Sequence, residues 1–220
     1  MFRSTVSKVI LFTLAAIGWA GLAHAQAGSI STGFDGAHET RGAFVDVTPT
    51  RNMQITGFAL HMNAVPATID VYTKPGATTS ATASDPTAWT LLTTVEIDGN
   101  GPGVGTGINI PAVSINAGDT VAFYLVSDQD GKMLVSNSPV TSASNADVTI
   151  EGNFESHGLF TSVFAGWGFL GTVCYDGGDC GAAASIPPLP VPFTSGLWVL
   201  LLLSALMLLM ARKSLTSRFN

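Results

Sequence analysis

Hydrophobic positions alternate with polar ones through the middle of the chain, which is the pattern of half-buried β-strands. The clearest alternation runs from Trp89 to Ile97, and shorter stretches rich in β-branched and aromatic residues recur between turn signals. No segment between residues 26 and 184 has a convincing helical period. The pattern predicts strands over residues 44–47, 53–62, 68–73, 89–97, 108–110, 113–115, 121–125, 133–135, 148–150 and 169–175.

Turn residues separate these predicted strands and indicate the fold class. Pro49 ends the first strand, Pro75-Gly76 turns the chain after the third, and residues 116–119 form a further turn. Near Gly57 the alternation changes face, which indicates a bulge. Many short strands with such turns predict an all-β fold, a single antiparallel β-sandwich of the Ig-like or jelly-roll type, over residues 26–184.

The N-terminal end has a different pattern, an uninterrupted apolar run over residues 9–22 that follows Arg3 and Lys8. The small residues of Ala23-His24-Ala25 lie at the two positions that signal peptidase reads. Residues 1–25 are therefore predicted to be a secretory signal peptide that is cleaved between Ala25 and Gln26. The alternative is an uncleaved anchor helix, for which the apolar run is short against the ~20 residues of a bilayer span.

The C-terminal end is predicted to contain a transmembrane helix over residues 193–211, a strongly apolar stretch without charge. A helix of this length is about 28 Å long, close to the ~30 Å thickness of the hydrocarbon layer. Arg212 and Lys213 follow at once and begin a basic tail over residues 212–220. Such residues remain in the cytoplasm, so the middle of the chain is expected on the outer side of the membrane. The alternative of a helix buried in the protein is disfavoured, because residues 26–184 offer no matching apolar groove.

A proline-rich segment over residues 185–192 precedes this span and is expected to be an extended spacer. The order of Pro-containing motif, apolar span and basic tail resembles the sorting signals of the PEP-CTERM and IPTL-CTERM families, which exosortases process in Gram-negative bacteria. The residues that resemble an IPTL-type motif are Ile186, Pro187, Pro188 and Leu189. The Glu of a Pro-Glu-Pro motif and the Ser-Glu-Trp-Gly of the IPTL type are absent. The resemblance implies cutting by an exosortase-like enzyme, and the alternative is a plain anchor that is never processed.

The middle of the chain also resembles a secreted bacterial β-sandwich module that recurs in surface proteins with C-terminal sorting signals. The resemblance covers most of residues 44–175 and implies the fold and the export, with no catalytic residue to carry over. The segments that carry it are GAFVDVTPTRNMQITGFALHM, TIDVYTKPGA, DPTAWTLLTTVEIDGNG, INAGDTVAFYLV and SNADVTI.

Charge and cysteine content agree with export. All 15 acidic residues lie between Asp35 and Asp179, where they face four basic residues, so that this part has a net charge of −11. Such acidity argues against a nucleic-acid partner. The two cysteines, Cys174 and Cys180, are predicted to form a structural disulfide, as cysteines of exported chains do. The alternative of a metal or redox pair lacks both the Cys-x-x-Cys spacing and a nearby histidine.

Catalytic motifs are missing from the middle of the chain. There is no Gly-x-Ser-x-Gly elbow, and His38-Glu39 is not followed by a second histidine at zincin spacing. His38 is therefore expected to be a solvated loop residue, and His61 an edge or face residue of a strand. The Gly-rich residues 99–107 lack the Gly-Lys-Ser/Thr of a phosphate loop and are expected to connect two strands. Once the signal peptide is removed, the remaining histidines are His38, His61 and His157.

Four aspartates and one tryptophan are weak candidates for ligand binding. Asp128-x-Asp130-Gly131 resembles the opening of a calcium loop, but Lys132 stands at the next ligand position, and a hairpin turn is favoured. Asp176 and Asp179 are a second weak cation pair, with solvated turn residues as the favoured alternative. Trp89 is expected in the core with Leu91 and Val95. Trp167 lies between two glycines and is the candidate for stacking on a sugar, with a core position as the favoured alternative.

These patterns predict a non-enzymatic, exported cell-envelope or extracellular-matrix protein that needs no cofactor. Its expected partners are the membrane, signal peptidase and an exosortase-like processing enzyme. It is expected at the inner membrane first and then at the cell surface or outside. The alternative is a membrane-anchored binding module for Ca²⁺ or for an extracellular polysaccharide.

Overall fold

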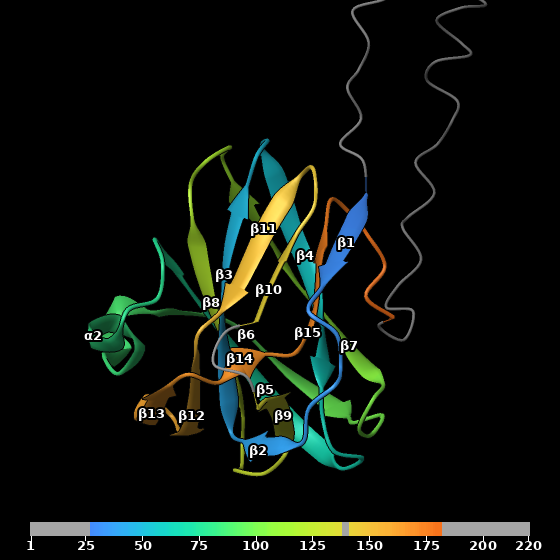
Figure 1. Ribbon diagram of the computed structural model, residues 1–220, viewed down its shortest axis with the longest axis vertical. Coiled ribbons are helices and arrows are strands. Elements are labelled where there is room, and N and C mark those ends of the chain that lie inside the picture. Colours follow the sequence, from blue (N-terminus) through green and yellow to red (C-terminus); the bar gives the residue numbers. More distant parts are fainter. Residues whose placement is uncertain (1–26, 138–140, 182–220) are drawn as a thin grey trace, which may run out of the picture. The chain divides into compact units, whose positions relative to one another are not determined.

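Antiparallel strands make up most of the computed structural model, which describes residues 27–137 and 141–181 (Figure 1). All described residues belong to one compact unit of the chain, Met1–Ala182. In the larger sheet the strand order is β10-β11-β3-β8-β5-β6, and a β12–β13 hairpin is added at β3. Its strands are β3 (Gly42–Pro49), β5 (Pro66–Pro75), β6 (Thr90–Asp98), β8 (Val121–Ser127), β10 (Thr141–Ser144), β11 (Val148–Gly152), β12 (Phe154–Gly158) and β13 (Thr161–Ala165).

Two smaller sheets complete the strand arrangement. The order in the four-stranded sheet is β1-β15-β4-β7, and in the three-stranded sheet it is β14-β9-β2. Their strands are β1 (Gly28–Ser31), β2 (His38–Thr40), β4 (Met53–His61), β7 (Gly105–Ile115), β9 (Met133–Ser136), β14 (Gly168–Phe169) and β15 (Gly171–Tyr175). Every pairing between these named strands is antiparallel, which confirms the predicted all-β, antiparallel fold class.

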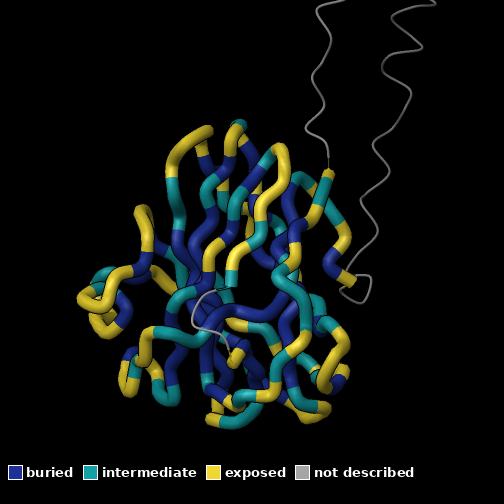
Figure 2. The backbone as a smooth tube through the Cα atoms, in the orientation of Figure 1, coloured by how far each residue is buried: buried dark blue, intermediate teal, exposed yellow. Residues whose placement is uncertain are grey.

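The main core lies between the larger sheet and the four-stranded sheet, in the buried interior of Figure 2. The rings of Phe58 on β4 and Phe123 on β8 meet there in a T-shaped contact, with centroids 5.1 Å apart. On β5, Ile69 and Val71 are fully buried and face this core, as their alternation with polar neighbours predicts. Contact between rings of two different sheets shows that the inner faces pack directly against each other.

A second hydrophobic cluster covers the outer face of the larger sheet. Phe44 on β3 stacks on Tyr124 on β8 at 4.1 Å between centroids, and Trp89 packs beside them. The cover comes from β12 and β13 together with α2 (Ser80–Ala83) and η1 (Pro86–Ala88). Strands β3 and β8 are thus buried on both faces, which explains their nearly continuous apolar sequences.

The predicted environment of Trp89 is only partly correct. Trp89 is buried, but in the outer cluster, and its indole Nε1 donates to the carbonyl of Thr82 at 2.7 Å. Leu91, expected on the same buried face, is half exposed. Between Val71 and Tyr72 of β5 the register with β6 shifts, because Leu92 is an extra residue in β6. This bulge interrupts the alternation that the prediction extended from Trp89 to Val95.

The predicted bulge near Gly57 is confirmed. The register between β4 and β7 shifts between Ile55 and Gly57, and a Cβ at Gly57 would come within 2.6 Å of the Ile108 carbonyl oxygen. On the facing strand, residues around Pro111 belong to one continuous strand, β7, instead of the two pieces expected. Strand β7 is at the edge of its sheet, where proline can be accommodated because it needs no ladder hydrogen bond there.

The disulfide between Cys174 and Cys180 is present as predicted. It joins the end of β15 to the turn that follows, with 5.7 Å between the two Cα atoms. Both cysteines are buried, and the connection between them lies against β1, where a Cβ at Gly178 would collide with the carbonyl group of Gly28. The bridge therefore fastens the C-terminal end of the folded domain.

The predicted segments at the two ends lie outside the described residues. These are the signal peptide (1–25), the proline-rich segment (185–192), the apolar span (193–211) and the basic tail (212–220). Within residues 27–137 and 141–181, no helix has the length and apolar character needed to cross a bilayer.

We expect the disulfide to contribute about 2 kcal/mol to the free energy of unfolding, the chain-entropy value for a closed loop of about six residues. The double variant Cys174→Ala/Cys180→Ala of the full chain in detergent should therefore melt several degrees below the oxidised wild type in circular dichroism. Wild-type protein with a reducing agent is the matched control and should melt with the variant. Equal melting temperatures for oxidised wild type and variant would contradict this contribution.

Candidate functional site

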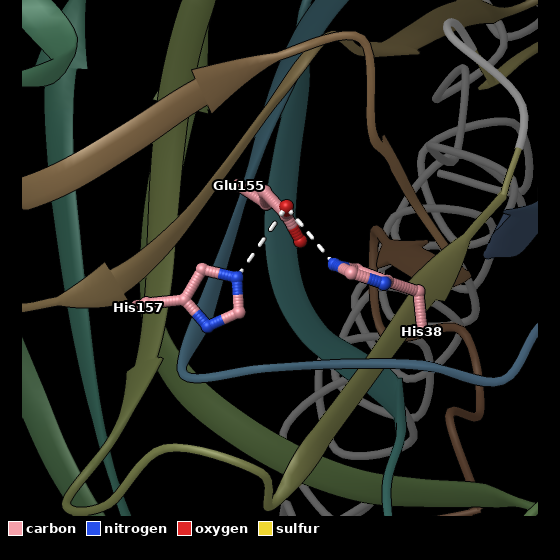
Figure 3. A group of neighbouring side chains, drawn as sticks. All are labelled: His38, Glu155 and His157. Carbon is pink, nitrogen blue, oxygen red and sulfur yellow. Dashed lines mark hydrogen bonds and ion pairs between the residues drawn. The ribbon is translucent and has the colours of Figure 1, made fainter.

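Two histidines and one glutamate meet at the end of the domain formed by β2, β9 and the β12–β13 hairpin (Figures 1 and 3). His38 lies on β2, whereas Glu155 and His157 lie on β12. Residues two apart on a strand face the same side, so Glu155 and His157 project together. Ser156 between them projects to the other side, where its hydroxyl shares a 2.7 Å hydrogen bond with that of Tyr124.

Backbone pairing brings β2 next to β12, although 117 residues separate His38 from Glu155. Strand β2 runs almost directly into β3, whose first residues pair with β12. The Thr40 hydroxyl and the Arg41 backbone N–H both donate to the carbonyl of Ser156, at 2.8 and 3.0 Å. Gly42 permits this close approach, since a Cβ there would lie 3.0 Å from the Ser156 hydroxyl oxygen and 2.8 Å from the Tyr124 ring on β8.

The three side chains converge on a single carboxylate oxygen, Oε1 of Glu155. His38 Nε2 lies 3.1 Å from this oxygen and His157 Nε2 lies 3.6 Å from it. Figure 3 shows both imidazoles directed at Glu155 from opposite sides. One nitrogen of each histidine and one oxygen of the glutamate all lie within 4.8 Å of one another. This is the only such group of three or more His, Cys, Asp or Glu in the part of the chain that the structure describes.

Glu155 is the buried member of the cluster. Its side chain is 1% exposed, against 31% for His38 and 30% for His157. Its second oxygen, Oε2, is buried and has no hydrogen-bond partner within the described ranges. A buried carboxylate oxygen without a partner is unfavourable, so the cluster as it stands leaves the charge of Glu155 incompletely compensated.

Groups around the cluster hold the two imidazoles in place. Asp130, in the turn between β8 and β9, lies with both carboxylate oxygens 2.9 and 3.0 Å from His157 Nδ1. Because a carboxylate accepts, this contact places a proton on Nδ1 and leaves Nε2 directed at Glu155. The ring of Trp167 stacks on His38 with 3.8 Å between centroids and 14° between planes. The exposed Phe164 ring meets His157 edge-on at 5.8 Å.

The calcium-loop candidates do not converge on a cation site. Both carboxylate oxygens of Asp128 accept from Lys132 Nζ at 2.9 Å, while Asp130 turns to His157. Lys132 therefore neutralises one member of the pair, and the favoured interpretation as a turn agrees with this geometry.

The aspartates of the disulfide loop also accept hydrogen bonds from protein groups. Asp176 accepts from Arg51 Nη1 at 2.7 Å and from the Gln54 backbone N–H at 2.9 Å. Asp179 accepts from the N–H of Gly181 in its own turn. Asp176 has positive φ and serves as a structural ion pair between this turn and the start of β4.

Trp167 is half-buried and packs against the main core. One face of its ring stacks on His38. Trp167 therefore packs against the core, as the favoured alternative predicts, and also contacts the histidine cluster. A hollow of about 490 Å³ elsewhere on the domain, lined by residues such as Asn52 and Asp176, contains neither histidine.

The sequence interpretation missed this cluster. His38 was expected to be a solvated loop residue, whereas it is part of β2 and is held between Glu155 and Trp167. The local signal in the sequence is weak, because Glu155-Ser156-His157 has no motif spacing and its partner lies far away in the chain. Two imidazole nitrogens and one carboxylate can hold a proton between them, or can serve as three ligands of a divalent metal ion.

His61 lies on a strand, as expected, and is more deeply buried than an edge position would be. It is fully buried on β4, and its Nε2 accepts from the backbone N–H of Gly103 at 2.9 Å. Its Nδ1 is buried without a partner in the described part of the protein. Burial lowers the pKa of His61, against a smaller opposing effect of Asp35. Gly103 belongs to residues 99–104, which connect β6 to β7, as expected.

Comparison with known proteins adds no assignment: no family model matches the chain, and no curated protein matches it.

The buried His61 should make the protein less stable in mild acid. Its folded-state pKa is lowered from the ordinary value of 6.5, so the unfolded chain binds the proton first as the pH falls below about 6.5. Above about pH 6.5, His61 is neutral in both states and does not lower the free energy of unfolding. Between that pH and the lowered pKa of the folded state, the free energy of unfolding falls as the pH falls. His61→Gln keeps an acceptor for Gly103 and does not titrate. Urea unfolding at pH 7.5 and pH 5 should show a larger loss for wild type than for His61→Gln, and equal losses would contradict this assignment.

Proposed function

We propose that the protein is an exported, non-enzymatic component of the cell envelope or extracellular matrix. The observation that carries the proposal is the order of elements after the disulfide, with a proline-rich motif, an apolar span and a basic tail over residues 185–220. Together with the apolar, basic-flanked residues 1–25, this order supports delivery of the intervening domain across the inner membrane.

The proposed route has two processing steps. Signal peptidase cleaves between Ala25 and Gln26, and the helix over residues 193–211 holds the domain on the outer side of the inner membrane. Arg212 and Lys213 keep the tail in the cytoplasm. An exosortase-like enzyme then cuts between Ile186 and Pro190, where the prolines keep the chain out of helices and sheets, and transfers the domain to the cell surface or matrix.

Properties of the domain support residence outside the cytoplasm. A disulfide forms and persists in an oxidising compartment, and here it closes the domain five residues before the proline-rich segment begins. The two sheets that share the main core support placing the fold among sandwiches of the Ig-like or jelly-roll type. The net charge of −11 over residues 35–179 favours solubility of the domain and repels nucleic acid and other polyanions.

The contacts of the histidine cluster differ from those of a serine- or cysteine-based active site. Within the described ranges, His38 and His157 contact carboxylates, and no serine or cysteine is hydrogen-bonded to either imidazole. A nucleophile activated by an adjacent base needs such a contact. The nearest hydroxyl in sequence, that of Ser156, is directed to Tyr124 on the other side of the strand.

The alternative of a glycan or Ca²⁺ module has less support. Asp128 and Asp176 are paired with Lys132 and Arg51, and the ring face of Trp167 is stacked on His38. A partner polysaccharide in the matrix remains compatible with the proposal, with contacts outside these residues.

Processing can be tested by intact mass and membrane fractionation of the protein from its native host. We expect a mature species that begins at Gln26, ends before Phe193 and lies outside the inner membrane. The double variant Pro187→Ala/Pro188→Ala should accumulate in the inner membrane with its tail attached, whereas Pro192→Ala, beyond the proposed cut, should be processed like wild type. A stable wild-type species in the inner membrane that retains residues 212–220 would overturn the proposed route.

A further inference from the structure

The buried Glu155 lacks an adequate counter-charge in the described structure. Its Oε1 is shared by two imidazoles at 3.1 and 3.6 Å, and its Oε2 has no partner. Native proteins pair buried carboxylates or use them to bind cations, because an ionised group without compensation is strongly unfavourable away from water. A divalent cation bound by both imidazoles and the carboxylate would supply this counter-charge.

Protons on the histidines account for the arrangement less well than a metal ion does. A proton on His38 Nε2 compensates Oε1 and leaves Oε2 unpaired. Protonation of both rings would place two positive charges at centroids 5.8 Å apart. The contact with Asp130 already places a proton on Nδ1 of His157, so that in the neutral ring the lone pair of Nε2 points into the cluster.

We infer that His38, Glu155 and His157 form a binding site for a divalent transition-metal ion of the Zn²⁺ type. Zn²⁺ binds histidine nitrogens and carboxylate oxygens at about 2.0–2.2 Å, which holds tetrahedral donors about 3.4 Å apart. The two nitrogen–oxygen distances of 3.1 and 3.6 Å lie on either side of that value, and all three donors lie within 4.8 Å. Small side-chain rotations of the half-exposed histidines bring them to bonding distance.

The surroundings match those of known types of metal site. A ligating histidine ordinarily donates its other N–H to a carboxylate, which orients the ring and raises its basicity. Asp130 has this relation to His157. Trp167 is stacked on the ring of His38 and restricts its rotation. Asp130 and Trp167 are positioning residues, and neither is a ligand.

The ligand set selects the class of metal. Two imidazoles with one carboxylate suit zinc and its late first-row neighbours, whereas Ca²⁺ and Mg²⁺ prefer sites made of oxygen ligands. Three protein ligands leave a fourth position for water or an external donor. Binding requires the neutral tautomer of His38 with its proton on Nδ1, so that the lone pair of Nε2 is available to the metal ion.

Calorimetric titration of the EDTA-treated full chain in detergent with ZnCl₂ tests the site. We expect one Zn²⁺ per chain and a melting temperature that rises with Zn²⁺ and returns with EDTA. Ca²⁺ should leave the melting temperature unchanged. Co²⁺ should give visible absorption bands of a bound, low-symmetry ion and lose them when Zn²⁺ is added.

Variants separate this site from adventitious binding. Glu155→Gln and His157→Gln should each weaken Zn²⁺ binding at least tenfold, and Asp130→Asn should weaken it by about 10–100-fold through the orientation of His157. Glu39→Gln is the matched control, because Glu39 is next to His38 in the chain but accepts from Asn63, and it should bind like wild type. Circular dichroism identifies variants that fail to fold. If a ligand variant fails to fold, the Zn²⁺ affinity of Asp130→Asn relative to wild type tests the site instead.

The inference is overturned if folded wild-type protein binds no Zn²⁺. It is also overturned if Glu155→Gln and Asp130→Asn bind Zn²⁺ with wild-type affinity, since the ion would then lie elsewhere. Neither result depends on whether the chain is exported or processed.

Discussion

Strand β3 is the element on which the rest of the domain depends, because it is paired along both edges and buried on both faces. Strand β8 pairs along one edge, and β11 and β12 divide the other edge between them. Val45 and Val47 face the main core, whereas Phe44 faces the outer aromatic cluster. Almost every layer of the structure therefore meets at a segment of eight residues.

The outer cover of the larger sheet is fixed to β3 by a buried polar contact. Asp46 accepts from the backbone N–H and the hydroxyl of Thr78, in the segment that leads into α2. Burial raises the pKa of Asp46 and lowers that of the neighbouring Lys74, whose ammonium group donates to three carbonyl oxygens. Both oxygens of Asp46 and the ammonium group of Lys74 are hydrogen-bonded, which is the condition under which buried polar groups are tolerated.

The histidine cluster depends on the same strand and contrasts with that saturated contact. Because β11 ends at Gly152 and β12 begins at Phe154, the second edge of β3 passes from one partner to the other. The first residues of β3 therefore pair with β12, and this pairing places Glu155 beside β2. Asp46, Asp128 and Asp176 each have donors for their carboxylates, whereas Glu155 has an oxygen without one. The unpaired oxygen therefore distinguishes Glu155 from these aspartates and is the reason for assigning the metal ion to it.

The sequence alone determined the all-β class, the approximate course of most long strands, the bulge near Gly57 and the disulfide. These features are encoded locally, by alternation, turn residues and the pairing of two cysteines close in the chain. The tertiary structure decided where alternation is interrupted by an extra residue, as at Leu92, and that a second cluster buries Trp89. It also decided the site, because strand pairing sets His38 beside Glu155 across 117 residues and no local pattern encodes that distance. The short strands that carry these side chains owe their conformation to partners on β3 and β9, so their own sequences hold little periodic signal.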